Sequence, residues 1–288
     1  MQKSVLLLLF PVFASLSLAA QKTGGRLQFD QGKTLTVTVD LKNTMAQQAG
    51  GQAIDFSTTG SATHSFRVTN TTDDNTTLHH EVQRIGFSFD GMGQKVNYDT
   101  DHKKKGPLSQ QFDELLGKKY DMIIDPAGKT LRAIPEKIEL AKQDERMMII
   151  TNMLKDLTGV VYPPAKGSPS FFSILPAGET GVGDSWTETV NTDTEKATTV
   201  SNLSAITDST IVIDFKTSSV VNIKAEMMGM ETKTSLTNTT TGQIILDKKT
   251  GIIRERTSVT DTNGNTEVMG TTLPLTGKTT ITMRVTQD

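Results

Sequence analysis

The sequence contains no cysteine, and this absence removes several chemistries together. Without cysteine the chain forms no disulfide, offers no thiolate to a metal and has no cysteine nucleophile. A bacterial lipid anchor, which is attached to a cysteine, is excluded for the same reason. The fold must therefore rest on an ordinary hydrophobic core, which a chain of this length is large enough to build.

Long apolar runs are absent after the first 20 residues. Residues 1–20 have a basic start at Lys3, an apolar stretch from Val5 to Leu18 and the small residues Ala19 and Ala20. This is the pattern of a secretory signal peptide, and the apolar stretch is shorter than the roughly 20 residues of a membrane-spanning helix. We therefore expect export to the periplasm or the extracellular space, with no membrane span and no lipid anchor.

An excess of either charge is also missing, because 30 lysines and arginines face 32 acidic residues, a net charge of -2. Nucleic-acid-binding proteins usually carry a clear basic patch or stripe. The one basic cluster, 102–105, follows Asp99 and Asp101 and is typical of a solvated loop. The composition thus argues against a nucleic-acid partner.

Threonine, valine and isoleucine are abundant, and they favour strands because branching at Cβ suits a pleated surface. Leu35, Val37 and Val39 alternate with polar residues, which predicts a strand with one wet face. Turn signals separate such runs and predict a meander of hairpins. The turn signals are Gln31-Gly32, Asp73-Asp74-Asn75, Asp90-Gly91, Asp125-Pro126-Ala127-Gly128 and Asn263-Gly264-Asn265.

Two segments have helical spacing instead. Residues 108–116 place apolar residues on one side and stop at Gly117. Residues 135–158 begin with a proline, which the first turn of a helix tolerates, and carry apolar residues three or four apart. A connector rich in proline and glycine follows before the strands resume.

The chain repeats itself weakly across the second helix. Residues 123–132 resemble 245–254, and 32–39 resemble 183–190. The alternative is chance similarity between threonine-rich strands.

We predict residues 21–288 to be a single mainly β domain with minor α content, after a signal peptide at 1–20. Its antiparallel meanders form two weakly similar halves, 27–133 and 183–287, in a curved sheet or open barrel covered by one central helix.

Three features resemble an uncharacterised secreted bacterial family, domain of unknown function 6263. They are the signal peptide, the Gly183-Asp184-Ser185-Trp186 strand start preceded by Leu175-Pro176, and the Asp-Pro-x-Gly-Lys turn at 125–129. The resemblance would cover most of the chain after residue 20 and implies export and β content. That family brings no known activity, ligand or catalytic residue.

Catalytic motifs are scarce. Gly183-Asp184-Ser185 has the start of an esterase motif, but leucine is replaced by Trp186 and no histidine follows His102. Gly128-Lys129 and Gly277-Lys278 lack the earlier glycine of a phosphate loop. We therefore predict no catalytic residue, no enzyme activity and no cofactor.

A hairpin around Asp73 and Asp74 would place His64 opposite His80, with His79 on the other face. Two facing histidines could share zinc, but no third ligand is visible in a known spacing. We interpret them as hydrogen-bonded strand histidines and predict no metal site.

Soft apolar residues remain as candidates to line a ligand site, since flexible methionines suit irregular cores as well as adaptable pockets. The candidates are Met147, Ile150, Met153, Leu154, Phe171, Phe172, Trp186, Met227, Met228 and Met230. The first hypothesis is a non-catalytic carrier or sensor of an apolar small molecule or lipid. The alternative is a cell-surface or periplasmic structural or assembly protein with a protein partner and no small ligand.

The signal peptide gives a first testable prediction. The mature chain should begin near Gln21 and carry no acyl chain, because no cysteine follows Ala20. Intact-mass measurement of protein isolated from its own cells checks this. A species that retains residues 1–20, or one heavier by acyl chains, would contradict it.

Overall fold

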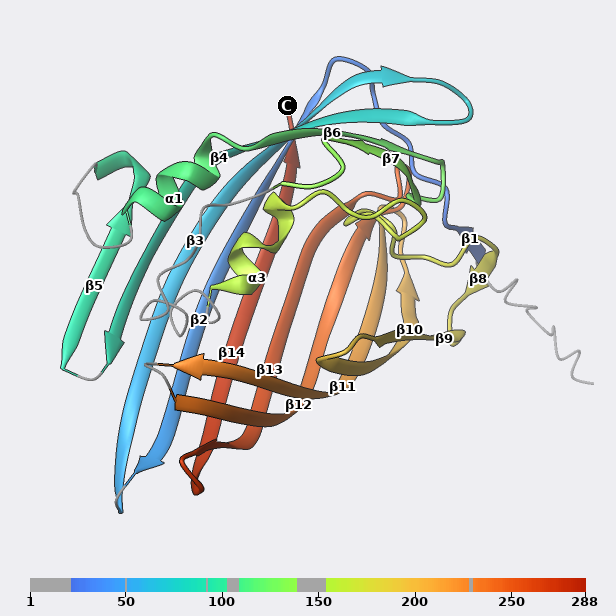
Figure 1. The fold of residues 1–288 in the computed structure, drawn as a ribbon. Helices are drawn as coiled ribbons and strands as arrows, with labels where there is room; N and C mark the ends of the chain where they lie inside the picture. Colours follow the sequence, from blue (N-terminus) through green and yellow to red (C-terminus); the bar gives the residue numbers. More distant parts are fainter. Residues whose placement is uncertain (1–21, 50, 92, 103–108, 139–153, 228–229) are drawn as a thin grey trace, which may run out of the picture.

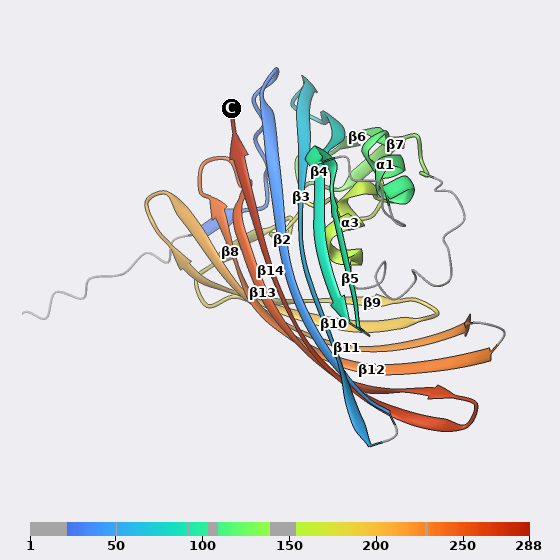
Figure 2. The same ribbon diagram turned by 90° about the vertical axis from the view of Figure 1, so that its left-hand side faces the viewer.

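Long antiparallel strands dominate the structure, a computed structural model that describes residues 22–49, 51–91, 93–102, 109–138, 154–227 and 230–288. Twelve strands pair into one sheet, which is strongly curved and does not close on itself (Figures 1 and 2). The predicted mainly β, antiparallel fold is confirmed, in the form of a curved open sheet. None of the helices in the described ranges is long and apolar enough to cross a membrane.

The sheet takes strands from both ends of the chain. The earlier strands are β2 (Thr34–Ala49), β3 (Gln52–Thr71), β4 (Thr76–Gly91), β5 (Gln94–Asp99), β6 (Lys119–Ile124) and β7 (Thr130–Ile134). The later strands are β9 (Ser185–Asn191), β10 (Glu195–Ile206), β11 (Thr210–Met227), β12 (Met230–Asp247), β13 (Ile253–Val268) and β14 (Thr271–Gln287). A separate short pair joins β1 (Lys22–Gly24) to β8 (Glu179–Gly181).

The order of strands across the sheet is β7-β6-β4-β3-β2-β14-β13-β12-β11-β10-β9, and β5 also pairs with β4. The earlier and later strands thus each form a continuous part of the sheet, and the two parts meet where β2 pairs with β14. Because consecutive strands are neighbours, short hairpins connect most of them. The internal repeat of the two halves stays a prediction.

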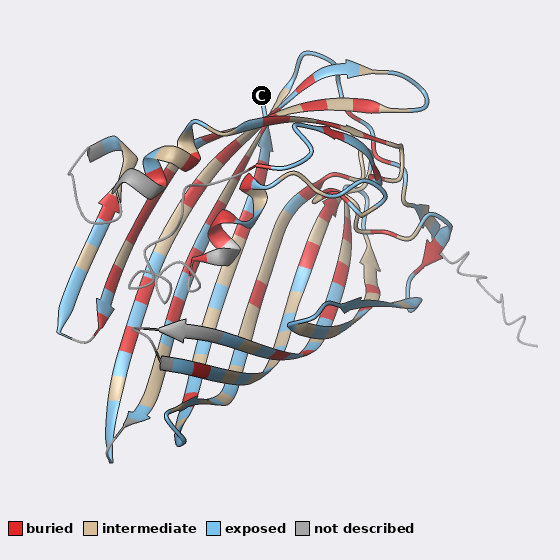
Figure 3. Ribbon diagram, in the orientation of Figure 1, coloured by how far each residue is buried: buried red, intermediate tan, exposed pale blue. Residues whose placement is uncertain are grey.

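Alternation of side chains decides which face of the sheet is buried. On β2, Leu35, Val37 and Val39 are at most 2% exposed, while the threonines between them are partly exposed. Val285 lies opposite Val37 and Met283 opposite Val39, so β14 adds to the same buried face. Figure 3 shows these buried positions as bands that continue from strand to strand.

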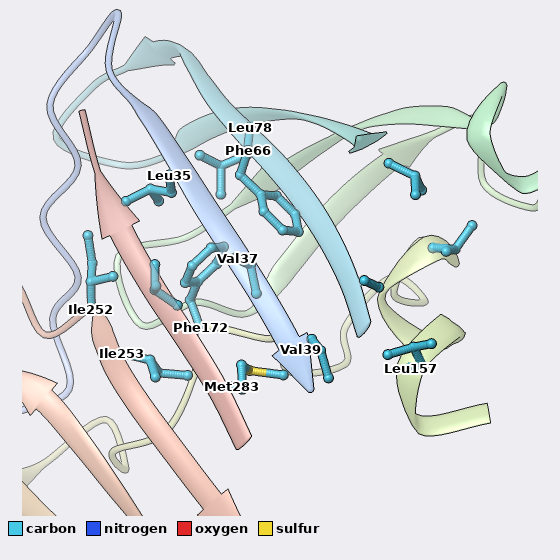
Figure 4. Packing of buried hydrophobic residues seen from close by; sticks show 14 of the residues in the cluster. Leu35, Val37, Val39, Phe66, Leu78, Leu157, Phe172, Ile252, Ile253 and Met283 are labelled. Carbon is cyan, nitrogen blue, oxygen red and sulfur yellow. The ribbon is translucent and has the colours of Figure 1, made fainter. Parts of the chain in front are cut away.

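The segment after residue 153 packs inside the curve of the sheet (Figure 2). It contains α3 (Lys155–Thr158) and the 3-10 turn η3 (Gly159–Val161), and Leu157 is fully buried. A Cβ atom at Gly60 of β3 would lie 3.0 Å from Leu157 Cδ2, so glycine allows this close approach. Further along, Phe172 packs edge-on against Phe66, with ring centres 5.3 Å apart (Figure 4). Phe172 packs edge-on against Phe29 as well, at 5.4 Å.

The predicted central helix 135–158 is wrong at its start. Residues 135–138 form bends and coil after a cis Ile134–Pro135 bond, and α3 begins at Lys155. Pairing of β7 with β6 extends the chain up to Ile134, and a residue that precedes proline avoids helical geometry. Residues 139–153 of the predicted helix lie outside the described residues.

The shorter predicted helix is confirmed as α1 (Ser109–Leu116), with Phe112 and Leu115 buried. It follows the 3-10 turn η1 (Thr100–His102), which comes directly after β5. The predicted turn at Asn263-Gly264-Asn265 is wrong, because these residues pair with β12 and β14 in the middle of β13. The hairpins here are longer than local turn signals indicate.

Two similar turns hold the N-terminal segment between the two parts of the sheet. The Asp125 carboxylate accepts hydrogen bonds from the backbone of its own turn, and Asp247 does the same in the β12–β13 turn. Leu27 N donates to Pro126 O at 2.7 Å, and Gln28 N donates to Thr250 O at 2.8 Å. The segment at 27–28 therefore bridges the β6–β7 turn at one edge of the sheet and the β12–β13 turn of the later strands.

The packing of α3 gives a stability prediction. Leu157→Ala should lower the free energy of unfolding by about 2–5 kcal/mol, because it removes buried methyl groups and leaves a cavity. Leu131→Ala is the matched control, since Leu131 is 40% exposed and its loss should change stability by only about 0.5 kcal/mol. Denaturant unfolding measures both variants. Equal effects would contradict the docking of α3.

Candidate functional site

The concave face of the sheet is the candidate functional site. Along the strands, away from the apolar residues packed under α3, the side chains on this face change from apolar to uncharged polar. Asn43 follows Leu41 on β2 at a spacing of two and therefore lies on the same face. Side chains directly opposite each other on paired strands share a face, so the register extends this assignment to the neighbouring strands.

A row of uncharged polar side chains crosses this face at one level. The residues pair in unbroken register from β10 to β3. They are Thr199, Thr217, Thr240, Thr260, Thr279, Asn43 and Thr58. One level further along the strands lie Ser219, Asn238 and Thr262. We call these ten residues the hydroxyl belt.

Hydrogen bonds link members of the belt across the strands. The hydroxyls of Thr199 and Thr217 lie 2.8 Å apart, and so do those of Thr240 and Thr260. In the second row the Asn238 amide donates to Ser219 Oγ at 3.1 Å and accepts from Thr262 at 2.8 Å. A hydroxyl has one donor and two acceptor sites, so each of these bonds leaves hydrogen-bonding capacity over.

Asn43 is the exception within the belt. Its side chain is 8% exposed, and its Oδ1 atom has no hydrogen-bond partner among the described residues. It lies between Thr279 on one side and Thr58 on the other. A buried amide oxygen without a donor costs free energy, and this one has almost no accessible surface, so the cost is borne within the packed sheet.

Apolar residues return beyond the belt. Val221 and Leu275 are each 8% exposed, and Leu236 lies between them in register, opposite Gly264. A Cβ atom at Gly264 would lie 2.9 Å from Leu236 Cδ2, so the leucine side chain lies over the glycine. Met45 and Phe56 on β2 and β3 are level with the second row of the belt and continue the apolar surface there. We call these five residues the apolar rim, namely Val221, Leu236, Leu275, Met45 and Phe56.

Most charged residues of the same strands lie on the convex face. The register places there, among others, Asp40, Lys42, Asp214, Lys216, Lys224, Lys233, Glu255, Asp261, Lys278 and Arg284. Several form ion pairs, for example Arg284 with Glu255 at 3.2 Å. Arg256 faces the concave side, where its guanidinium lies 4.9 Å from the centre of the Phe215 ring. The belt and the rim contain no charged residue, but Glu188 pairs with Thr199 and Glu195 pairs with Val221, so both carboxylates share this face.

An open depression of about 580 Å³ lies at the tips of β2, β3 and β14. Asp55, Asp90 and Lys278 contribute to its lining and face the convex side by register. Lys278 is paired with Asp261 at 3.1 Å. Met45 and Phe56 of the apolar rim line it as well, so its open wall is partly apolar and partly charged.

The histidine pair lies within the core. His64 Nδ1 and His80 Nε2 are 3.1 Å apart, so one ring donates a hydrogen bond to the other. The two residues meet diagonally, because a register shift at Thr63 and His64 places His64 opposite Val82 and His80 opposite Phe66. The direct opposition predicted from the sequence is therefore wrong, whereas the contact between the rings is present.

Burial controls the charge of both histidines. It lowers the pKa of His64 to about 4, and the backbone of Leu157 opposes this only in part. Burial, followed by the nearby His64 and His79, lowers the pKa of His80 to about 3. The His80 ring also stacks on Tyr120 at 4.4 Å, and burial raises the pKa of that phenol. All three rings are neutral at pH 7.

A metal would find few ligands at this pair. His79 lies on the other face, where its Nδ1 is 2.7 Å from Asp121 Oδ1. Zinc takes three or four protein ligands, and the described ranges hold no group of three or more histidine, aspartate or glutamate side chains arranged for a metal. The pair is therefore a neutral hydrogen bond that joins β3 to β4.

The ligand candidates named from the sequence are distributed over several environments. Leu154 and Phe172 are fully buried in the hydrophobic core, and Phe171 and Trp186 pack against that core while partly buried. Met147, Ile150, Met153 and Met228 lie outside the described residues, as do the side chains of Met227 and Met230. Their role in ligand binding stays a prediction.

The sequence alone did not predict the hydroxyl belt. Threonine alternates along most strands, and it occurs on both faces, as Thr279 and Thr280 illustrate. The alternation shows which residues share a face of one strand. Only the register shows that residues of seven strands stand at one level.

Part of this chain matches a known protein family. Residues 164–253 match a family of unknown function (DUF6263). This match contains the connector and β8 to β12, and it confirms the resemblance stated from the sequence over these residues. No curated protein matches the sequence.

Two solved structures illustrate the similarity in shape. A lipovitellin structure described as showing lipid–protein interactions has a TM-score of 0.49 and 9% identity, over 91% of this chain and 26% of that one. The chain thus spans about a quarter of the lipovitellin chain. An outer membrane channel of Pseudomonas putida F1 has a TM-score of 0.29 and 8% identity, over 91% of this chain and 98% of that one.

The histidine pair predicts a pH dependence of stability. The pKa of both histidines is lowered in the folded state, so between about pH 6.5 and 4 the unfolded chain binds more protons than the folded chain. The free energy of unfolding should therefore be unaffected above pH 6.5. It should fall as the pH is lowered towards 4, by up to about 1.4 kcal/mol per pH unit for each histidine.

The comparison of variants isolates this effect. His64→Leu combined with His80→Phe should flatten the dependence of unfolding free energy on pH, whereas His79→Gln should keep it. Urea unfolding at several pH values between 4 and 8 measures the slopes. Identical slopes in the double variant and the parent would contradict the assignment to the buried pair.

Proposed function

We propose that the chain is an exported, non-catalytic binding protein that carries or senses an apolar ligand on the concave face of its sheet. The scarcity of charge on the concave face is the observation that carries this proposal. Among the described residues of β2 and β11 to β14, Arg256 is the one charged residue that the register places on this face, while Glu188 and Glu195 lie at its β9–β10 side. A face with an apolar rim and a few uncharged polar groups suits a ligand that is mostly hydrocarbon.

The composition of the belt supports binding over catalysis. A threonine or serine hydroxyl becomes a nucleophile when a base lies within hydrogen-bond reach. The partners of Thr199, Thr240 and Thr262 are other hydroxyls and the Asn238 amide. These neutral groups orient a ligand without accepting its protons.

Assembly with a protein partner is the second candidate, and the β9 edge favours it. β9 pairs with β10 on one side, and most of its side chains are exposed. An edge strand can accept an added strand from another chain. Glu188 in the middle of β9 acts against this, because a charge at an edge discourages further pairing.

Two adjacent valines test the apolar ligand proposal. Val221 is 8% exposed on the apolar rim, while Val220 is 47% exposed on the convex face. Val221→Lys should weaken binding of a fluorescent hydrocarbon probe by about tenfold or more, because it places a charge where the apolar ligand lies. Val220→Lys should bind the probe as the parent does.

Probe titration, with melting temperature as a check of folding, separates the outcomes. If the parent binds no apolar probe, or if both variants bind it equally well, the concave face is not an apolar site. Native mass spectrometry of protein from its own envelope then addresses the second candidate. A bound lipid supports the carrier, and a bound protein without lipid supports assembly.

A further inference from the structure

The two ends of the sheet, β7 and β9, differ in how they are covered. At the β7 end, Thr130 N donates to Ser168 O at 2.9 Å and Thr130 O accepts from Gly167 N at 2.8 Å, so the connector covers the start of that strand. At the other end, β9 pairs with β10, and no segment within the described ranges pairs with its outer side. Every residue of β9 except Trp186 is exposed. The β9 edge is therefore accessible to a further strand.

Hydrogen bonds at both ends of the β9–β10 pair show which backbone groups face inward. Leu203 N donates to Asp184 O at 3.0 Å, and Thr192 N donates to Glu195 O at 2.8 Å. Bonded positions recur at every second residue of an antiparallel pair, so the backbone of the even-numbered residues 184 to 192 faces β10. The backbone of the odd-numbered residues faces away from the sheet.

The outward backbone groups belong to Thr187 and Thr189 in the middle of β9. A strand added antiparallel to β9 would exchange hydrogen bonds with both residues, as in strand addition to other sheet edges. The side chains of Trp186, Glu188 and Val190 lie between and beside these positions on the concave face. Each would meet one side chain of the added strand in the closer, non-hydrogen-bonded type of pair.

Glu188 determines which strand fits. Its cross-strand neighbour is Thr199, and Trp186 and Val190 lie two residues away on the same face, so the register places no cation beside it within the described residues. A basic side chain on the added strand would pair with this carboxylate, and an acidic one would be repelled. Val190 is 54% exposed, so an apolar residue two positions from the basic one would cover it.

The same carboxylate disfavours a second copy of this chain as the partner. Two β9 strands aligned antiparallel over their full length, with their concave faces on one side, would place Glu188 opposite its own counterpart. Like charges directly opposite each other destabilise a strand pair. Glu188 thus discourages self-pairing and still admits a basic strand.

We propose that β9 is a docking site for an extended segment of another protein, which adds antiparallel to β9 with a basic residue opposite Glu188 and apolar residues opposite Trp186 and Val190. The backbone of Thr187 and Thr189 provides the hydrogen bonds, and Glu188 selects the sequence. This inference rests on the second candidate function, for which it names the chemistry of the partner. It does not depend on an apolar ligand on the concave face.

Two fluorescently labelled peptides test the selection, acetyl-Thr-Val-Thr-Lys-Thr-Val-Thr-amide and its counterpart with glutamate in place of lysine. Each is titrated with the mature chain, and fluorescence anisotropy measures binding. The lysine peptide should bind about five- to tenfold more tightly, because Glu188 attracts the one and repels the other. Glu188→Lys should reverse this preference. Glu195→Lys, the same change on the same face but on β10, should keep it.

Substitutions of Thr189 locate the peptide. Thr189→Pro removes the outward N–H group and places the proline ring where the peptide would lie, while Thr189→Val keeps that N–H group. Thr189→Pro should weaken binding of the lysine peptide at least about tenfold, and Thr189→Val should bind it as the parent does. The melting temperature should be unchanged in both, because an edge strand tolerates proline where its N–H group faces solvent.

The outcomes separate this inference from the functions on which it builds. If neither peptide binds the parent, or if Thr189→Pro binds the lysine peptide as well as the parent does, β9 is not the docking site. If both peptides bind equally, or if Glu188→Lys keeps the preference of the parent, Glu188 does not select the partner and the inference is wrong. A protein found by native mass spectrometry together with either failure would keep the second candidate function and overturn the β9 site. The hydrocarbon probe should bind Thr189→Pro as it binds the parent, so the apolar site is tested separately.

Discussion

The pairing of β2 with β14 is the interaction on which the rest of the structure depends. It joins strands from opposite ends of the chain, and its apolar cross-strand contacts, Val37 with Val285 and Val39 with Met283, lie in the middle of the core. Without it the sheet would divide into two smaller sheets, each with a long unpaired edge. The same pairing fixes the level of Asn43 against Thr279, and so it also aligns the two parts of the hydroxyl belt.

Close packing on the concave face depends on glycine. Phe215 lies over Gly242, Leu236 over Gly264 and Met45 over Gly277, each within 3.2 Å of the position that a Cβ atom would occupy. A curved sheet crowds the side chains on its inner face, and a glycine opposite each large residue relieves that crowding. The curvature and the apolar rim therefore have a common cause in the pairing of large residues with glycine across strands.

The polar groups in the core differ in kind from those in the hydroxyl belt, although both lie on the concave face. In the core, the His64–His80 pair is fully buried and stays neutral because burial lowers the pKa of both rings. Farther along the strands, the polar groups are hydroxyls and amides that never carry a charge. Most formal charges lie on the convex face, where water solvates them and opposite charges pair. The middle of the concave face is thus polar in places but poor in charge, with Arg256 held over Phe215 and Glu188 and Glu195 at the β9–β10 side.

The sequence by itself determined the antiparallel β class, the short helix α1, the alternation on β2 and the contact between two strand histidines. These follow from local rules, because side-chain period and turn chemistry act between residues close in the chain. Local rules failed at Pro135, where pairing with β6 keeps the chain extended up to Ile134, and at Gly264, where pairing with β12 and β14 continues the strand through a turn signal. Tertiary structure alone decided that Thr240, Thr279 and Asn43 stand in one row, since register between strands is a long-range property, and a shift by one residue would turn each of them to the opposite face.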